Sequence, residues 1–262
     1  MQRDTPKGHN AVKQKIQNTM ATISFTNTDA PDVSPAKDLA VVKPAEVAVA
    51  PSRNSGGSGI EGEITARDVS LPRLNLVQKT GGLADNYSPG AFILNKEIQI
   101  CAPKESFTGT ALRLKKSYQQ KLVYGAPEQP LRANTSEEVR ALGGSLIYGH
   151  DNYWQDVADI LMAVKAPKDL KEDDLNFFPY EFGGDNFAVA IYTVASSSYT
   201  SLAKRIITDG SQLLKAGLYT GQYSITSDLR RNGANSWWIP VPEFAGKHSA
   251  EGQEFFRGLA GL

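Results

Sequence analysis

The stretch FAVAIYTV, residues 187–194, decides the fold class of this chain. Successive side chains of a strand point to opposite faces, so Phe187, Val189, Ile191 and Thr193 would share one face. A short apolar run that is rich in β-branched and aromatic residues is typical of a buried strand. We therefore expect residues 187–194 to form a strand at the centre of a sheet.

The segments around this stretch predict a mainly β (α+β) domain. Residues 154–164 fit a strand and a helix equally well, and one main helix is expected over 200–216, capped by Ser198 or Thr200 and ended by Gly217. Shorter helices are expected from Thr135 and over 253–262. The other expected strands are an extended segment at 64–77, a hairpin at 91–101 that bends at 95–97, a strand at 110–118, and strands at 218–226 and 237–241 joined by a polar turn through 230–235.

The first sixty residues have a different composition. The chain contains 10 Phe, 10 Tyr and 3 Trp residues, yet only Phe25 lies in this region. Four prolines interrupt residues 31–51, and SRNSGGSG at 52–59 is a flexible linker by composition. We predict a disordered tail over 1–60 and a single β-rich domain over 61–262. The tail is either a solubilising extension or an arm that docks a partner.

Charge and cysteine content narrow the classes of partner. Lys plus Arg and Asp plus Glu each number 28, so no net field attracts nucleic acid or an anionic membrane, and a basic site must be local. The single cysteine, Cys101, excludes an internal disulfide. No apolar run approaches the roughly 18 residues of a membrane helix. We expect a cytoplasmic protein without membrane contact.

The sequence contains no complete catalytic constellation. Ser201 and Lys204 fit S-x-x-K and residues 79–81 read K-T-G, but their order along the chain is the reverse of that in penicillin-recognising enzymes. None of the three histidines, His9, His150 and His248, has a second His or Cys at metal-ligand spacing. We expect no enzymatic activity, no cofactor and no metal site.

Cations and aromatic rings alternate in two parts of the chain. Along the 110–118 strand, Leu112 and Leu114 are expected on one face, with Arg113 and Lys115 on the other. Such a combination suits single-stranded nucleic acid, because cations neutralise the backbone while exposed rings stack on bases. The candidate nucleic-acid-binding residues are Arg113, Lys115, Lys116, Tyr118, Lys121 and Tyr124 in the first part, and Arg230, Arg231 and Trp238 in the second.

The same residues also fit a purely structural interpretation. The rings would then belong to the core, and the cations to the solvated face of an edge strand. Adjacent Trp237 and Trp238 must point to opposite faces of a strand, so one is expected in the core and one at a surface. An outer ring beside Arg230 and Arg231 would be the best candidate stacking platform.

The segments VSLPRLNLVQ at 69–78 and GAFILN at 90–95 resemble those of a loose group of bacteriophage proteins. Several of these are regarded as single-stranded DNA-binding or replication accessory proteins, and the outline of the resemblance extends over most of residues 64–241. It implies an OB-like, five-stranded β-barrel elaborated by loops and one main helix, which binds oligonucleotides across a strand face. Many such proteins end in an acidic tail that recruits replication partners. This chain ends EFFRGLAGL, residues 254–262, so recruitment would fall to the N-terminal tail.

Two functions of different classes follow. The first is non-enzymatic binding of single-stranded DNA in phage DNA replication or recombination. The alternative is a viral structural or assembly protein that acts through self-association as a homo-oligomer, because large aromatic residues near strand ends serve a protein interface equally well.

Overall fold

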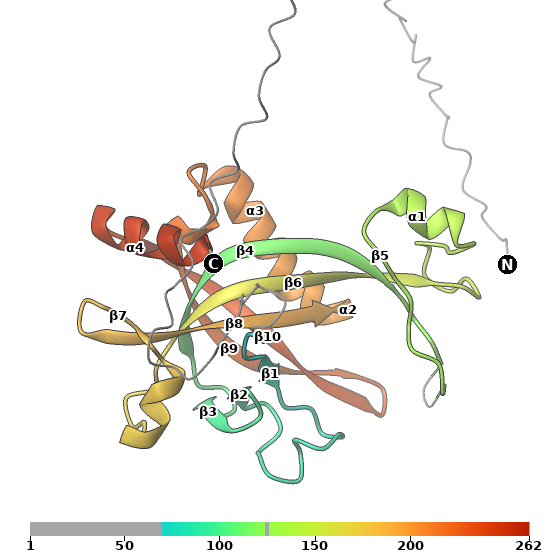
Figure 1. The fold of residues 1–262 in the computed structure, drawn as a ribbon. Coiled ribbons are helices and arrows are strands. Elements are labelled where there is room, and N and C mark those ends of the chain that lie inside the picture. The colour runs from blue at the N-terminus through green and yellow to red at the C-terminus, as the bar shows by residue number, and fades with distance from the viewer. Residues whose placement is uncertain (1–69, 124–125, 262) are drawn as a thin grey trace, which may run out of the picture. The chain divides into compact units, whose positions relative to one another are not determined.

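The computed structural model describes residues 70–123 and 126–261 (Figure 1). The tail predicted over 1–60, the start of the extended segment predicted at 64–77, and Tyr124 lie outside the described residues. The strands are β1 (Leu74–Leu76), β2 (Phe92–Leu94), β3 (Ile98–Cys101), β4 (Phe107–Gln120), β5 (Arg132–Ala133), β6 (Trp154–Lys165), β7 (Tyr180–Phe182), β8 (Asp185–Ala195), β9 (Gly221–Asn232) and β10 (Asn235–Lys247). The helical elements are α1 (Ser136–Ala141), the 3-10 helix η1 (Glu172–Phe177), α2 (Ser196–Ser198), the π-helical turn η2 (Tyr199–Ala203), α3 (Lys204–Gln212), the 3-10 turn η3 (Leu218–Thr220) and α4 (Ala250–Ala260).

These strands form two antiparallel sheets, so the fold is mainly β, as predicted. The larger sheet has seven strands in the order β10-β9-β4-β6-β8-β7, with β5 paired to β4, and the smaller sheet has the order β1-β2-β3. Within the described residues, β10 and β7 do not pair with each other, so the sheet stays open and no closed barrel forms. The smaller sheet adjoins β8 through a parallel bridge between Arg73 and Ile191.

The outward-facing backbone groups of β10 are occupied by side-chain contacts. The side-chain amide of Gln78 binds both backbone groups of Trp238, accepting from its N–H at 2.9 Å and donating to its C=O at 3.0 Å. The Ser201 hydroxyl donates to the C=O of Pro240 at 2.6 Å. Pro240 and Pro242 have no N–H to offer a further strand. Side chains and prolines therefore occupy the positions through which β10 would pair.

Two predictions about the sheet need revision. The ambiguous stretch at 154–164 is strand β6, which pairs with β4 on one side and β8 on the other. Strand β8 is consequently not central, because only β7 lies beyond it in the sheet order. The predicted alternation of β8 is confirmed for Phe187 and Val189, which pack together beneath α4, whereas Tyr192 and Val194 belong to the main core.

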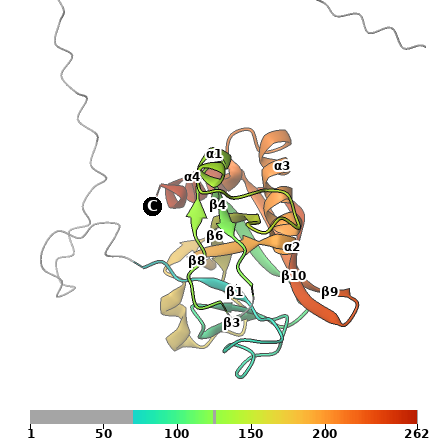
Figure 2. The same ribbon diagram turned by 90° about the vertical axis from the view of Figure 1, so that its right-hand side faces the viewer.

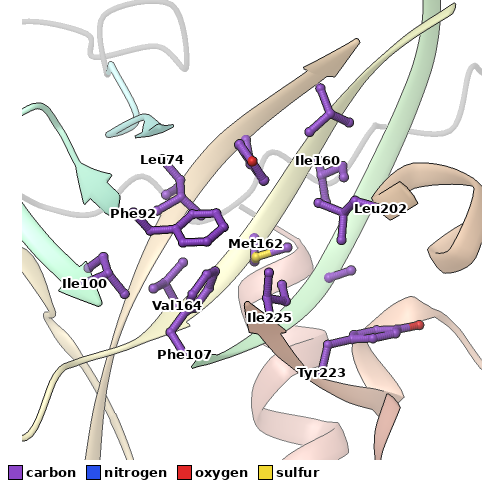
Figure 3. Packing of buried hydrophobic residues seen from close by; sticks show 14 of the residues in the cluster. Leu74, Phe92, Ile100, Phe107, Ile160, Met162, Val164, Leu202, Tyr223 and Ile225 are labelled. Carbon is purple, nitrogen blue, oxygen red and sulfur yellow. The ribbon is translucent and has the colours of Figure 1, made fainter. Parts of the chain in front are cut away.

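The main core fills one side of the larger sheet (Figure 3). The Phe92 ring meets Phe107 edge-on at a centroid distance of 4.9 Å and Tyr192 at 6.1 Å, while Met162 and Leu202 are fully buried beside them. We call this side of the sheet the core face. On the opposite side, here named the α4 face, a smaller cluster forms under α4 from Leu112, Ala163, Phe187, Val189, Phe256 and Leu259.

Local signals predicted several elements well. The 91–101 hairpin is β2 and β3, with left-handed backbone at Asn95 (φ 51°) and Lys96 (φ 65°) in its bend. Helix α1 follows Thr135, whose hydroxyl accepts from the Glu138 N–H at 3.1 Å. The helix predicted over 200–216 begins earlier, at Ser196 after the N-cap Ala195, changes from α2 through the π-helical turn into α3, and ends at Gln212. The predicted caps Ser198 and Thr200 and the predicted end at Gly217 are therefore wrong. None of the helices among residues 70–123 and 126–261 is long and apolar enough to cross a membrane.

Candidate nucleic-acid interface

A β-bulge in β4 determines where its cations point. The register with β6 passes from the pair Ala111–Met162 directly to Arg113–Leu161, so Leu112 has no partner of its own. Leu112 packs in the cluster under α4, whereas Leu114 packs against the main core. The prediction that these two leucines share a face is therefore wrong, because the extra residue of the bulge interrupts the alternation.

As a result, the cations predicted on one basic face of β4 are divided between the two faces of the sheet. Lys115 lies opposite Asp159 on β6, on the α4 face, together with Arg113. Lys116 lies opposite Ala158, a residue of the main core, and thus points to the core face. Adjacent strand residues cannot contribute to one site on a flat face.

On the core face, a cavity of 370 Å³ lies beyond the end of the main core. We call it the tyrosine groove. Tyr148 is 81% exposed, and its ring meets that of Tyr153 edge-on at 5.5 Å between centroids. Lys121 and Lys204 are exposed at the same cavity. The groove is lined by Lys121, Tyr148, Tyr153, Gln155, Asp156, Ser196, Tyr199, Thr200 and Lys204.

Lys116 stands at the wall of this groove. Its Nζ lies 3.0 Å from the Asp156 carboxylate, 4.9 Å from the centre of the Tyr118 ring and 6.0 Å from that of Tyr199. Burial alone would lower the pKa of Lys116, but the hydrogen bonds to Asp156 and Tyr118 outweigh it and raise this pKa above its ordinary value. Lys116 is therefore charged at neutral pH, and Asp156 already offsets part of that charge.

Tyr118 does not offer a free ring. It packs against Ala133, Val139 and Trp154 in a small cluster beneath α1 and is half-buried. The ring that projects into solvent at this end of the molecule is Tyr148, in the loop between α1 and β6. The ring that could stack on a base beside the first cation-rich stretch is therefore Tyr148, which belongs to a different segment of the chain.

Of the two tryptophans, Trp238, the one named as a candidate binding residue, is the one in the core. Trp238 is only 8% exposed and packs on Gly90, where an added Cβ would come within 2.8 Å of the indole ring. It cannot stack on a base. Trp237 is half-buried and lies opposite Arg230, and its Nε1 donates to the Ser197 hydroxyl at 2.8 Å.

The β9–β10 hairpin approaches the tyrosine groove through this contact. Ser197 follows Ser196, a lining residue of the groove, and α2 lies beside β10 (Figures 1 and 2). Arg230 and Arg231, predicted in the turn, are exposed at the end of β9, and the turn itself is at Gly233 with φ 59°. Arg230 pairs with Asp228 at 3.3 Å, and Arg231 forms no ion pair with any described residue.

Of the nine residues that line the groove, sequence reasoning named only Lys121 as a binding candidate, and the rings and cation that it missed are Tyr148, Tyr153, Tyr199 and Lys204. Tyr199 and Lys204 are five residues apart, a spacing that does not share a face of an ordinary α-helix. In the π-helical turn the Lys204 N–H bonds to the Tyr199 C=O, which brings both onto the same side. The one available signal for Tyr148 and Tyr153 was their position on either side of Gly149, between the helix expected from Thr135 and residues 154–164.

His248, one of the histidines considered as a metal ligand, packs among other side chains. His248 lies 2.8 Å from the Thr110 hydroxyl and 4.3 Å, centroid to centroid, from the Phe256 ring, and burial lowers its pKa. Within residues 70–123 and 126–261, no three His, Cys, Asp or Glu side chains are grouped to hold a metal ion.

Comparison of the chain with protein-family models, with curated proteins and with solved structures gives no match in any of the three.

Proposed function

We propose that this protein binds single-stranded DNA without catalysing a reaction, and that the strand lies in the tyrosine groove. The observation that carries the proposal is the exposed Tyr148 ring, which contacts Tyr153 and lines the same groove as Lys121 and Lys204. A base stacked on such a ring contributes about 1–3 kcal/mol regardless of its identity.

The local charge supports this proposal although the whole chain is neutral. Lys121 and Lys204 line the groove, Lys116 pairs with Asp156 beside it, and Asp156 is the one carboxylate among its lining residues. The excess of positive charge attracts backbone phosphates. A duplex keeps its base faces stacked inside, so it would gain the charge interaction without the stacking.

The biological setting is part of the proposal and rests on the resemblance to phage replication proteins. In that setting the protein would act in phage DNA replication or recombination in the host cytoplasm, and its N-terminal tail would recruit replication proteins. The OB-like interpretation of the β body stays a prediction, because the sheet is open. The OB-fold is itself only a partly closed barrel, and it binds oligonucleotides across a strand face.

The test is quenching of tryptophan fluorescence during titration with an oligo-dT of about thirty nucleotides, at low and moderate salt, and with the matching duplex. Trp237, which contacts α2 beside the groove, is the expected reporter. Quenching that prefers the single strand and weakens with salt is expected. No response at low salt would contradict the proposal.

One observation favours the alternative of self-association in a viral assembly. Between β4 and β6 the described part of the chain exposes six large apolar side chains, which a protein interface would cover. These residues are Val123, Leu131, Leu142, Leu146, Ile147 and Tyr148. Discrete oligomers in light scattering, together with an absence of DNA binding, would favour this function over the first.

A further inference from the structure

We propose that the α4 face carries a second nucleic-acid site, which binds backbone phosphates and makes no ring contacts. It is formed by Arg73, Arg113, Lys115 and Arg132, which we call the basic strip. The inference extends the proposed function, since it gives one chain two separate positions for a single strand.

The centre of the basic strip is a shallow groove of 290 Å³ on the larger sheet. Arg113 and Lys115 are exposed at its wall, and half-buried Leu161 and Ile191 lie in it. Helix α4 covers the neighbouring part of this face, over Ala163 and Val189, but Leu161 is only partly buried beside that cluster. The sheet surface around Arg113 therefore remains open to a ligand.

The register adds Arg73 to the same surface. Arg73 is bridged to Ile191 on β8, and the next residue, Leu74, is buried in the main core. Because neighbouring residues point to opposite sides, Arg73 lies on the α4 face. Across the sheet the row runs Arg73, Ile191, Leu161, Arg113, so three strand spacings of about 4.8 Å separate the two arginines by roughly 14 Å.

The single carboxylate of this surface is already satisfied. Asp159 accepts from the Arg132 guanidinium at 3.0 Å and from the Thr193 hydroxyl at 2.6 Å. Arg73, Arg113 and Lys115 form no ion pair with any of the described residues. Three free cations therefore surround a neutralised acid, which is an arrangement that favours a polyanion over an isolated carboxylate.

The chemistry of the strip differs from that of the tyrosine groove. The residues lining the strip's groove include no aromatic ring, so bases gain no stacking energy there. Guanidinium groups bind phosphate oxygens with two parallel hydrogen bonds. Lys115 and Lys116 are adjacent in β4 but serve opposite faces, so the two sites are separated by the thickness of the sheet.

The experiment counts short oligonucleotides per chain. Isothermal titration of the full chain with an oligo-dT of about eight nucleotides at low salt should give two per chain, and the variant Arg113→Gln/Lys115→Gln should bind one. Its log affinity for a long strand should also depend less steeply on log salt, by about 1.4, since each lost contact with a single strand accounts for about 0.7. Tryptophan quenching by the remaining oligonucleotide should persist, because the groove is intact.

The matched control is Lys79→Gln/Lys215→Gln, which removes the same charge from exposed lysines that line neither surface. This control should keep two oligonucleotides per chain. A wild-type ratio of one that the Arg113→Gln/Lys115→Gln variant retains, or a ratio of two in that variant, would overturn the second site and leave the groove proposal standing. A wild-type ratio of one without tryptophan quenching, which falls to zero in the Arg113→Gln/Lys115→Gln variant, would instead refute the groove alone.

Discussion

Replacing Tyr148 with Ala tests the proposed groove at its most exposed ring. The side chain is 81% exposed and contacts the Tyr153 ring edge-on, so its removal costs the fold little, within about 0.5–1.5 kcal/mol. If one base stacks on this ring, the variant loses about 1–3 kcal/mol of binding, which is about a 5- to 150-fold weaker affinity for oligo-dT. The slope of log affinity against log salt should not change, since no charge is removed.

Two further variants make this experiment decisive. Tyr148→Phe keeps the π face and should retain nearly all the affinity, whereas Ile147→Ala removes a neighbouring apolar side chain that is 65% exposed but cannot stack. Fluorescence anisotropy of labelled oligo-dT gives all affinities on one scale. Equal loss in Tyr148→Ala and Ile147→Ala would point to a general apolar contact and refute the stacking argument.

Three other predictions concern charge, packing and pH. Lys121→Gln/Lys204→Gln should lower the salt slope of single-strand binding by about 1.4, and an unchanged slope would remove both lysines from the interface. Gly90→Ala should destabilise the fold by about 1–3 kcal/mol in denaturant unfolding, because Gly90 has φ 99° and its new Cβ would meet the Trp238 ring at 2.8 Å. The control is Gly149→Ala, which has a similar φ of 92° but no atom within 4 Å, so it measures the backbone cost without the clash. Burial lowers the pKa of His248 below 6.5, so the folded state favours the neutral ring; this contribution to stability should be complete above pH 6.5 and be lost as the pH falls through the lower folded value. Thermal unfolding at pH 7.5 and pH 5 should show a larger drop for the wild type than for His248→Gln, and equal drops would exclude His248 as the source.

The parts of the fold that were predictable depend on residues close together in the sequence. Thr135 and Glu138 define a helix start within one turn, and Asn95 and Lys96 supply the left-handed backbone of a hairpin. The alternation of β8 is equally local. In each case the sequence itself contains the interaction that selects the structure.

What could not be predicted depends on partners distant in the sequence. The bulge at Leu112 exists only in register with Leu161, and the burial of Trp238 depends on Gly90 and Gln78. Both contacts change the candidate site, because the bulge separates its cations and the burial of Trp238 removes a ring. The cation-rich stretches were recognised, but their division between two faces and the identity of the exposed ring were not, because a strand's alternation alone does not reveal a bulge.

The capped edge of β10 also bears on how this protein avoids aggregation. A long exposed edge strand is a template for uncontrolled strand addition, leading to fibrils or domain swapping. Gln78 clamps the Trp238 backbone and two prolines withhold N–H groups, so β10 offers a second molecule no continuous ladder. Strand addition at this edge of the sheet is therefore disfavoured, and self-association through the apolar side chains between β4 and β6 would leave the β10 edge unused.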